Sequence, residues 1–155
     1  MGCQQMDAVS YPNAKVIDFF SQYLAPVRVL ISSTPLPQQF KVKWTPTFVI
    51  LDSQGEEHHR SVGFLPPEEL IPSLTLGMAK TWFDHEKFSE ALSHLDRLIS
   101  EYPKSDVSAE AIYYRGVSRY KATNDASALK QAHETLQANY KDSEWAKRAS
   151  VYRLL

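Results

Sequence analysis

The chain has 155 residues, of which 43% are hydrophobic, and its 17 basic and 18 acidic side chains leave a formal net charge of −1. This composition suits one ordinary domain or two small ones with a hydrophobic core. The balanced charge excludes a polycationic surface of the kind that binds nucleic acid or anionic lipid. Because the sequence has neither a long apolar run nor a signal-peptide pattern, we expect a cytoplasmic protein that does not contact the membrane.

Cysteine and histidine, the usual zinc ligands, are few. The sequence has a single cysteine, Cys3, which cannot form an internal disulfide. His58 and His59 are adjacent, so on a strand they would point to opposite faces. The other three histidines are scattered along expected helices: His85, His94 and His133. The sequence therefore predicts no metal site and no cofactor.

The first 65 residues mix helix and strand patterns. Apolar residues recur at helical spacing over residues 16–24, after turn-forming residues at 11–13. A short buried strand is expected at residues 26–31. The stretch TFVILDSQGEEHHRSVGF then has an apolar run, a turn with Gly55 and a second extended run. This pattern predicts a β-hairpin with residues 52–55 as its loop.

From about residue 66 only helical patterns remain. An apolar face runs through residues 88–102 and stops at Pro103, which cannot continue a helix. A second helix is expected after Ser105 and Asp106, because both residue types cap helix N-termini well.

This helical part contains an internal repeat with a spacing of 38 residues. Six residues match in one register: Leu98, Tyr102, Ser105, Ala111, Tyr114 and Arg115 recur as Leu136, Tyr140, Ser143, Ala149, Tyr152 and Arg153. A period of this length indicates a helical solenoid. The small and large residues from Ala79 to Pro103 make residues 67–155 similar to tetratricopeptide repeats, although Ala79 stands where that family has glycine. The alternative is a plain helical bundle without a binding groove.

The stretch WTPTFVILD resembles the second half of the thioredoxin fold. The resemblance covers about residues 2–75 and implies that Pro46 is the cis proline of that family. It further implies that Trp44, Thr45 and Pro46 face an extended substrate peptide. The alternative is a trans proline that starts a strand.

Cys3 lies 43 residues before Pro46, close to the distance that this family shows between its redox motif CxxC and the cis proline. Met6 and Asp7 favour Cys3 as the second cysteine of the motif, and the alternative is a one-thiol motif that begins at Cys3. Either way the dithiol is incomplete. A lone Cys3 can form a mixed disulfide but cannot complete the usual exchange cycle alone.

The expected fold class is an α/β thioredoxin-like part at residues 1–66, followed by all-α, tetratricopeptide-like helices at residues 67–155. The sheet is expected to lack the strand that precedes the redox motif. Either the sheet closes up, or another chain supplies the strand and forms a homo-oligomer, or the sequence is a fragment of a longer protein. We favour the fragment.

The main functional hypothesis is a thioredoxin-like thiol–disulfide protein fused to a protein-interaction domain, without full oxidoreductase activity. The alternative is a non-catalytic interaction module that binds a protein or peptide, with Trp82, Tyr113 and Arg119 in a partner groove. A hydrolase built on Asp52, His58 or His59 has no motif in its favour.

Overall fold

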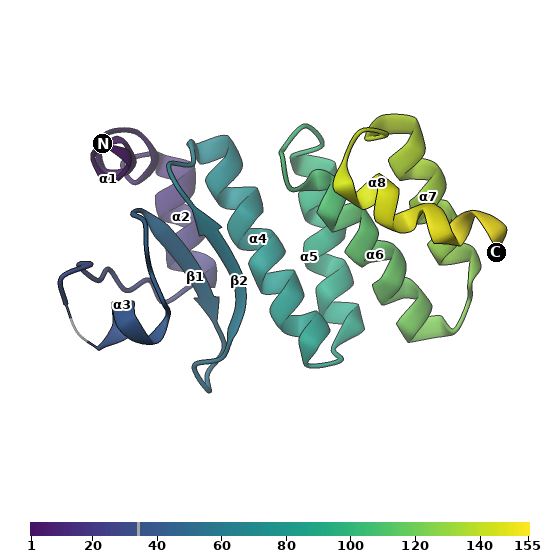
Figure 1. Ribbon diagram of the computed structural model, residues 1–155, viewed down its shortest axis with the longest axis horizontal. Helices are drawn as coiled ribbons and strands as arrows, with labels where there is room; N and C mark the ends of the chain where they lie inside the picture. Colours follow the sequence, from purple (N-terminus) through teal and green to yellow (C-terminus); the bar gives the residue numbers. More distant parts are fainter. Residues whose placement is uncertain (34) are drawn as a thin grey trace. The chain divides into compact units, whose positions relative to one another are not determined.

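The computed structural model describes residues 1–33 and 35–155. Figure 1 shows its elements in chain order: α1 (Gly2–Gln5), a π-helical turn (Met6–Ser10), α2 (Ala14–Tyr23), α3 (Leu36–Gln39), β1 (Thr47–Leu51), β2 (Glu57–Val62), α4 (Pro67–Asp84), α5 (Phe88–Glu101), α6 (Ser108–Thr123), α7 (Ser127–Asn139), α8 (Glu144–Arg148) and a 3-10 helix (Ala149–Leu154). Two compact units divide the chain. The first comprises Met1–Val49 and Arg60–Ile71, and the second comprises Ile50–His59 and Pro72–Leu155.

The amphipathic helix predicted after residues 11–13 is confirmed as α2. Asn13 caps it, because its side-chain oxygen accepts a hydrogen bond from the amide of Lys15 at 3.0 Å. Val16 and Phe19 are buried on its apolar face. The cap and the spacing of apolar residues are both local, which is why the sequence predicts this helix well.

The predicted hairpin is also confirmed, as β1 and β2. Its loop is organised by Asp52, whose Oδ1 accepts hydrogen bonds from the amides of Gln54 and Glu56, each at 2.9 Å. Gly55 adopts a φ of +83°, a left-handed conformation that costs glycine little. Within residues 1–33 and 35–155, these two strands form the only sheet.

The strand predicted at residues 26–31 is wrong. This segment forms neither helix nor strand, and its apolar side chains are exposed, with Val27 at 81% and Leu30 at 67%. A strand needs a partner to satisfy its backbone hydrogen bonds, and β1 and β2 pair only with each other among the described residues. The apolar run alone therefore did not determine the structure of the segment.

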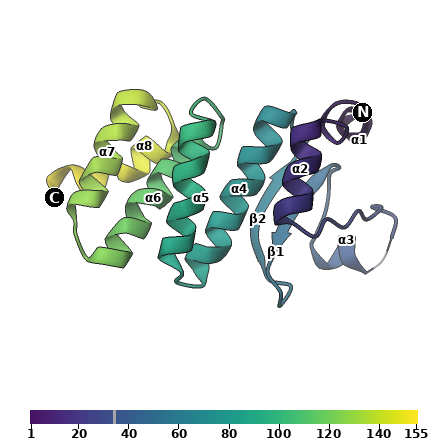
Figure 2. The ribbon, with the colours of Figure 1, turned by 180° about the vertical axis from the view of Figure 1, so that it is seen from behind.

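The C-terminal helices α5, α6 and α7 pack side by side, and α6 contacts both of its neighbours (Figure 2). Two clusters of buried side chains fill the spaces between helices. The first contains Leu76, Ala79, Ala91, Leu95, Leu98 and Ala111. The second contains Ala109, Ile112, Leu136, Ala146 and Ala149. No helix in the described part of the chain is long and apolar enough to cross a membrane.

The predicted end of α5 is confirmed, whereas α6 begins slightly later than predicted. Helix α5 ends at Glu101, two residues before Pro103, as expected. Helix α6 begins at Ser108, slightly later than expected, because Ser105 caps the preceding turn. The Oγ of Ser105 accepts a hydrogen bond from the amide of Val107 at 3.3 Å.

The 38-residue spacing relates equivalent positions of this helical part. Tyr102 and Tyr140 are the C-caps of α5 and α7. Leu98 and Leu136 are both fully buried. The repeat therefore has a structural basis in helix ends and core positions.

Helices α6 and α7 approach closely at Gly116. A Cβ atom added to Gly116 would lie 2.4 Å from the Cβ of Ala132 and 3.2 Å from the carbonyl oxygen of Ala128. Both contacts involve main-chain or Cβ atoms, which cannot move without shifting a helix. Only glycine fits at this crossing.

We expect Gly116→Ala to lower the free energy of unfolding by about 1–2 kcal/mol, measured by urea denaturation. Overpacking costs about 1–3 kcal/mol and exceeds the gain of about 1 kcal/mol in helix propensity. In the Ala132→Gly background, where the opposing methyl is absent, the same substitution should no longer destabilise. An equal loss in both backgrounds would show that the Gly116–Ala132 contact is not responsible.

Candidate functional site

The residue before the single cysteine packs against the loop that precedes β1. Cys3 is half-buried on α1, and the Thr45–Pro46 peptide bond is cis. A Cβ atom added to Gly2 would lie 2.7 Å from the Cδ of Pro46 and 3.4 Å from the carbonyl oxygen of Thr45. Helix α1 and the Thr45–Pro46 loop therefore touch at the neighbour of Cys3.

The loop is fixed on both sides of Thr45. The carbonyl of Pro46 accepts a hydrogen bond from the amide of Gly63 at 2.8 Å. The hydroxyl of Thr47 donates to the carbonyl of Trp44 at 2.6 Å. Pro46 is buried, Thr45 is exposed, and Trp44 is 74% exposed. The loop thus presents two exposed side chains, Trp44 and Thr45, on a backbone held by hydrogen bonds.

Two side chains of the π-helical turn form hydrogen bonds with the backbone of Leu65. The sulfur of Met6 accepts a hydrogen bond from the amide of Leu65 at 3.5 Å, and the hydroxyl of Ser10 donates to its carbonyl at 2.5 Å. Met6 and Ser10 are completely buried at the two ends of the π-helical turn. Such turns recur at functional sites, and here one follows directly on the helix that carries Cys3.

Arg28 and Asp7 form an ion pair. Both guanidinium nitrogens of Arg28 donate to the carboxylate of Asp7, at 2.7 and 3.0 Å. This pairing lowers the pKa of Asp7 and raises that of Arg28, and a thiolate at Cys3 would add to the rise. Burial raises the pKa of Tyr11, although the charge of Arg28 opposes the rise. The ion pair is exposed, so its contribution to stability is small.

The three residues expected in a partner groove, Trp82, Tyr113 and Arg119, contact different neighbours. Trp82 is 38% exposed on α4. Arg119 on α6 forms an ion pair with Asp96 at 3.4 Å. It also lines a small surface hollow beside Gly116, to which neither Trp82 nor Tyr113 contributes. No groove in the described residues joins all three, and their role in binding stays a prediction.

Tyr113 is part of an aromatic cluster. Its ring lies 5.2 Å from that of Trp145, and its hydroxyl is 3.0 Å from the hydroxyl of Tyr152. Burial, together with this hydrogen bond, raises the pKa of Tyr152 to about 12. Tyr113 is therefore half-buried against aromatic neighbours of the helical part.

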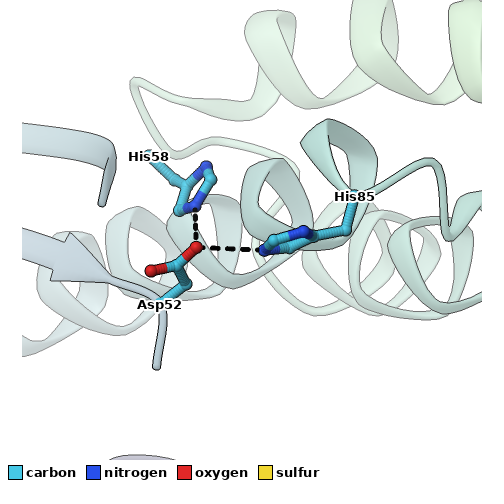
Figure 3. Close-up of side chains that lie close together, drawn as sticks. All are labelled: Asp52, His58 and His85. Carbon is cyan, nitrogen blue, oxygen red and sulfur yellow. Dashed lines mark hydrogen bonds and ion pairs between the residues drawn. The ribbon is translucent and has the colours of Figure 1, made fainter. Parts of the chain in front are cut away.

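The structure brings together two histidines that the sequence analysis kept apart. The Nε2 atoms of His58 and His85 each lie 3.2 Å from Oδ2 of Asp52 (Figure 3). The Nδ1 atom of His58 lies 2.6 Å from Oδ2 of Asp84. Asp52 follows β1 and His58 is on β2, whereas Asp84 is the last residue of α4 and His85 follows it directly. The only sequence signal was their position at element ends, because nothing local predicts that the hairpin loop meets this helix end.

Hydrogen bonds in this cluster shift the pKa values of Asp52 and His58 in opposite directions. Backbone hydrogen bonds from the loop, the first from Glu56, and the hydrogen bond to His58 lower the pKa of Asp52 to about 2, although burial opposes them. Burial alone would lower the pKa of His58, but the hydrogen bonds to Asp84 and Asp52 outweigh it and raise the pKa above its ordinary value. Asp52 is therefore an anion at neutral pH, in contact with two imidazoles.

A comparison with protein families finds a match in the N-terminal part. Residues 2–76 match a thioredoxin-like domain. The matched residues include Cys3, Pro46 and the hairpin, and they end ten residues after the domain boundary predicted at residue 66, which itself stays a prediction. No curated protein and no solved structure matches the chain. The predicted fold class is confirmed: a thioredoxin-like part with a small two-stranded sheet, followed by helices.

The buried histidine of the hairpin gives a pH test. His59 lies 3.2 Å from the hydroxyl of Ser73, and burial, aided by the charge of Lys80, lowers its pKa to about 4. Between about pH 6.5 and pH 4 the unfolded chain binds a proton at His59 that the folded chain does not accept. Stability should therefore fall by up to about 3 kcal/mol as the pH decreases through this range.

The measurement is the free energy of unfolding against pH for the wild type and for His59→Gln, which can keep a hydrogen bond to Ser73 but does not titrate. The difference between the two curves should be constant above about pH 7 and should change in favour of the variant down to pH 4. Parallel curves throughout would contradict the assigned pKa.

Proposed function

We propose that the thioredoxin-like domain binds a protein or peptide partner by disulfide exchange at Cys3, with Trp44, Thr45 and Pro46 holding the partner's extended chain. The packing of Gly2 against Pro46 carries this proposal, because it sets the helix of Cys3 against that loop. The match of residues 2–76 to a thioredoxin-like domain supports it.

The chemistry needs one nucleophile from this chain. The Cys3 thiolate attacks one sulfur of a partner disulfide, a new Cys3–partner disulfide forms, and the other partner sulfur leaves as a thiolate. These 155 residues contain no second cysteine, so they do not themselves supply the thiol that would later release the partner. The product of the chain's own step is therefore a mixed disulfide, which suits capture better than a complete redox cycle.

Recognition of the partner rests on the exposed loop. Trp44 offers a largely exposed aromatic surface, and Thr45 is accessible beside it. Aromatic side chains often dominate peptide binding, because they bury a large area with little loss of side-chain freedom.

The test uses a peptide whose single cysteine carries a coloured aromatic thiol in a disulfide. Attack by Cys3 releases the aromatic thiol, and its absorbance gives the rate. Trp44→Ala should slow this reaction about tenfold, the effect of about 1.4 kcal/mol of lost binding, but should leave unchanged the reaction with the symmetrical aromatic disulfide alone. Cys3→Ser should abolish both reactions.

Trp82→Ala is the matched control, since it removes an exposed tryptophan outside the Trp44–Pro46 loop. It should leave both rates unchanged. If Trp44→Ala slows neither reaction, or slows both by the same factor, the loop does not recognise the peptide and the proposal fails.

We also propose that the C-terminal helices are tetratricopeptide-like and bind a second partner without covalent chemistry. The exposed Trp82 and the structural equivalence of positions 38 residues apart favour this function. Tyr113 is left out of the test because its packing against Trp145 would confuse binding with stability.

In the second test, thiols are blocked and proteins retained from a cell extract are compared between variants. Trp82→Ala and Arg119→Ala should each reduce recovery of the same proteins several-fold, whereas Trp44→Ala should not. Unchanged recovery with both helical variants would count against binding by the helices.

A further inference from the structure

The hairpin loop and the end of α4 place three potential metal ligands around one point. Two are imidazole nitrogens, from His58 and His85, and the third is Oδ2 of Asp52 (Figure 3). All three atoms lie within 4.8 Å of one another. Imidazole nitrogen with a carboxylate oxygen suits zinc and related transition metals, whereas calcium and magnesium prefer oxygen ligands.

Two of the three ligand spacings already fit a tetrahedral ion. Ligand atoms about 2.0–2.1 Å from zinc stand about 3.3 Å apart in a tetrahedron. Oδ2 of Asp52 lies 3.2 Å from each of the two Nε2 atoms. The third spacing, between the two imidazole nitrogens, is at most 4.8 Å. The side chain of His85 is 42% exposed, so it can move to complete the site.

The two oxygens of Asp52 have separate partners. Oδ1 accepts the amides of Gln54 and Glu56 and thereby fixes the loop, which leaves Oδ2 directed at the histidines. The side chains of Asp52 and His58 are only 5% and 6% exposed. This carboxylate and this imidazole are therefore held in place before any ion binds.

Asp84 completes the arrangement behind His58. Its Oδ2 lies 2.6 Å from Nδ1 of His58. A carboxylate at Nδ1 keeps the proton on that nitrogen, so Nε2 is the nitrogen that can bind a metal ion once it has released its own proton. Histidines that bind metals usually have such a partner, and its removal typically weakens metal binding about 10–100-fold.

We propose that Asp52, His58 and His85 form a binding site for a divalent transition-metal ion of the zinc type, with Asp84 orienting His58. Three protein ligands leave one position of a tetrahedral ion for water or for a ligand from a partner. The site is distinct from Cys3 and does not depend on the proposed disulfide chemistry.

The test is a titration with Co²⁺, whose visible absorption reports tetrahedral coordination, followed by competition with Zn²⁺. It is done on the full chain carrying Cys3→Ser, so that a thiol cannot supply the signal. One equivalent of Co²⁺ should bind with an intense visible band, and Zn²⁺ should displace it. Asp84→Asn should weaken binding about 10–100-fold, and His85→Gln should weaken it further.

His94→Gln is the matched control, because it changes a half-buried histidine on α5, outside the cluster. It should bind Co²⁺ like the parent. Thermal unfolding provides a second measurement, since Zn²⁺ should raise the Tm of the parent and of His94→Gln but not of His85→Gln.

Two results would overturn the proposal. One is the absence of saturable binding in the parent chain, which would make the cluster a set of ion pairs only. The other is binding of one equivalent that survives both His85→Gln and Asp52→Asn, which would place the ion elsewhere.

Discussion

A two-stranded hairpin is only marginally stable in water unless another element packs against it. Here that element is α4. A Cβ atom added to Gly77 would lie 2.6 Å from Cγ1 of Ile50 and 3.1 Å from the Cβ of His59. Because Gly77 has no side chain, the backbone of α4 can pack directly against the strands. The burial of His59 and the meeting of Asp52 with His85 both require this close packing. The cis-proline loop before β1 and the carboxylate after it likewise depend on a strand that holds its position.

The features that the sequence predicted are those with local causes. Asn13 and the apolar spacing that follows it specify α2, and Pro103 sets the end of α5. The hairpin follows from Gly55 between two extended runs. The stretch at residues 26–31 has an equally apolar pattern, yet it is not a strand, because strand formation depends on a neighbour that the pattern cannot specify.

The candidate sites divide in the same way. The Thr45–Pro46 loop could be found from sequence, since threonine, proline and a β-branched run are contiguous and resemble a known family. The histidine cluster could not, because it joins residues 52 and 58 of the hairpin to residue 85 at the end of a helix. His58 and His59 are adjacent on β2 but have different partners, Asp52 and Ser73. The position of the helix end relative to the loop depends on how close Gly77 lets the helix approach.

Met6 and Ser10 provide the backbone of Leu65 with one acceptor and one donor, as the neighbouring residue in a sheet ladder would do. Two side chains of a helical turn thus replace one rung of strand pairing. Both hydrogen bonds go to main-chain atoms of Leu65. The link between this turn and the segment after β2 therefore does not depend on which side chain occupies position 65. Proline is the exception, since it has no N–H to donate. Selection on this link would therefore fall on positions 6 and 10, and related sequences should vary more freely at position 65 than at either of them.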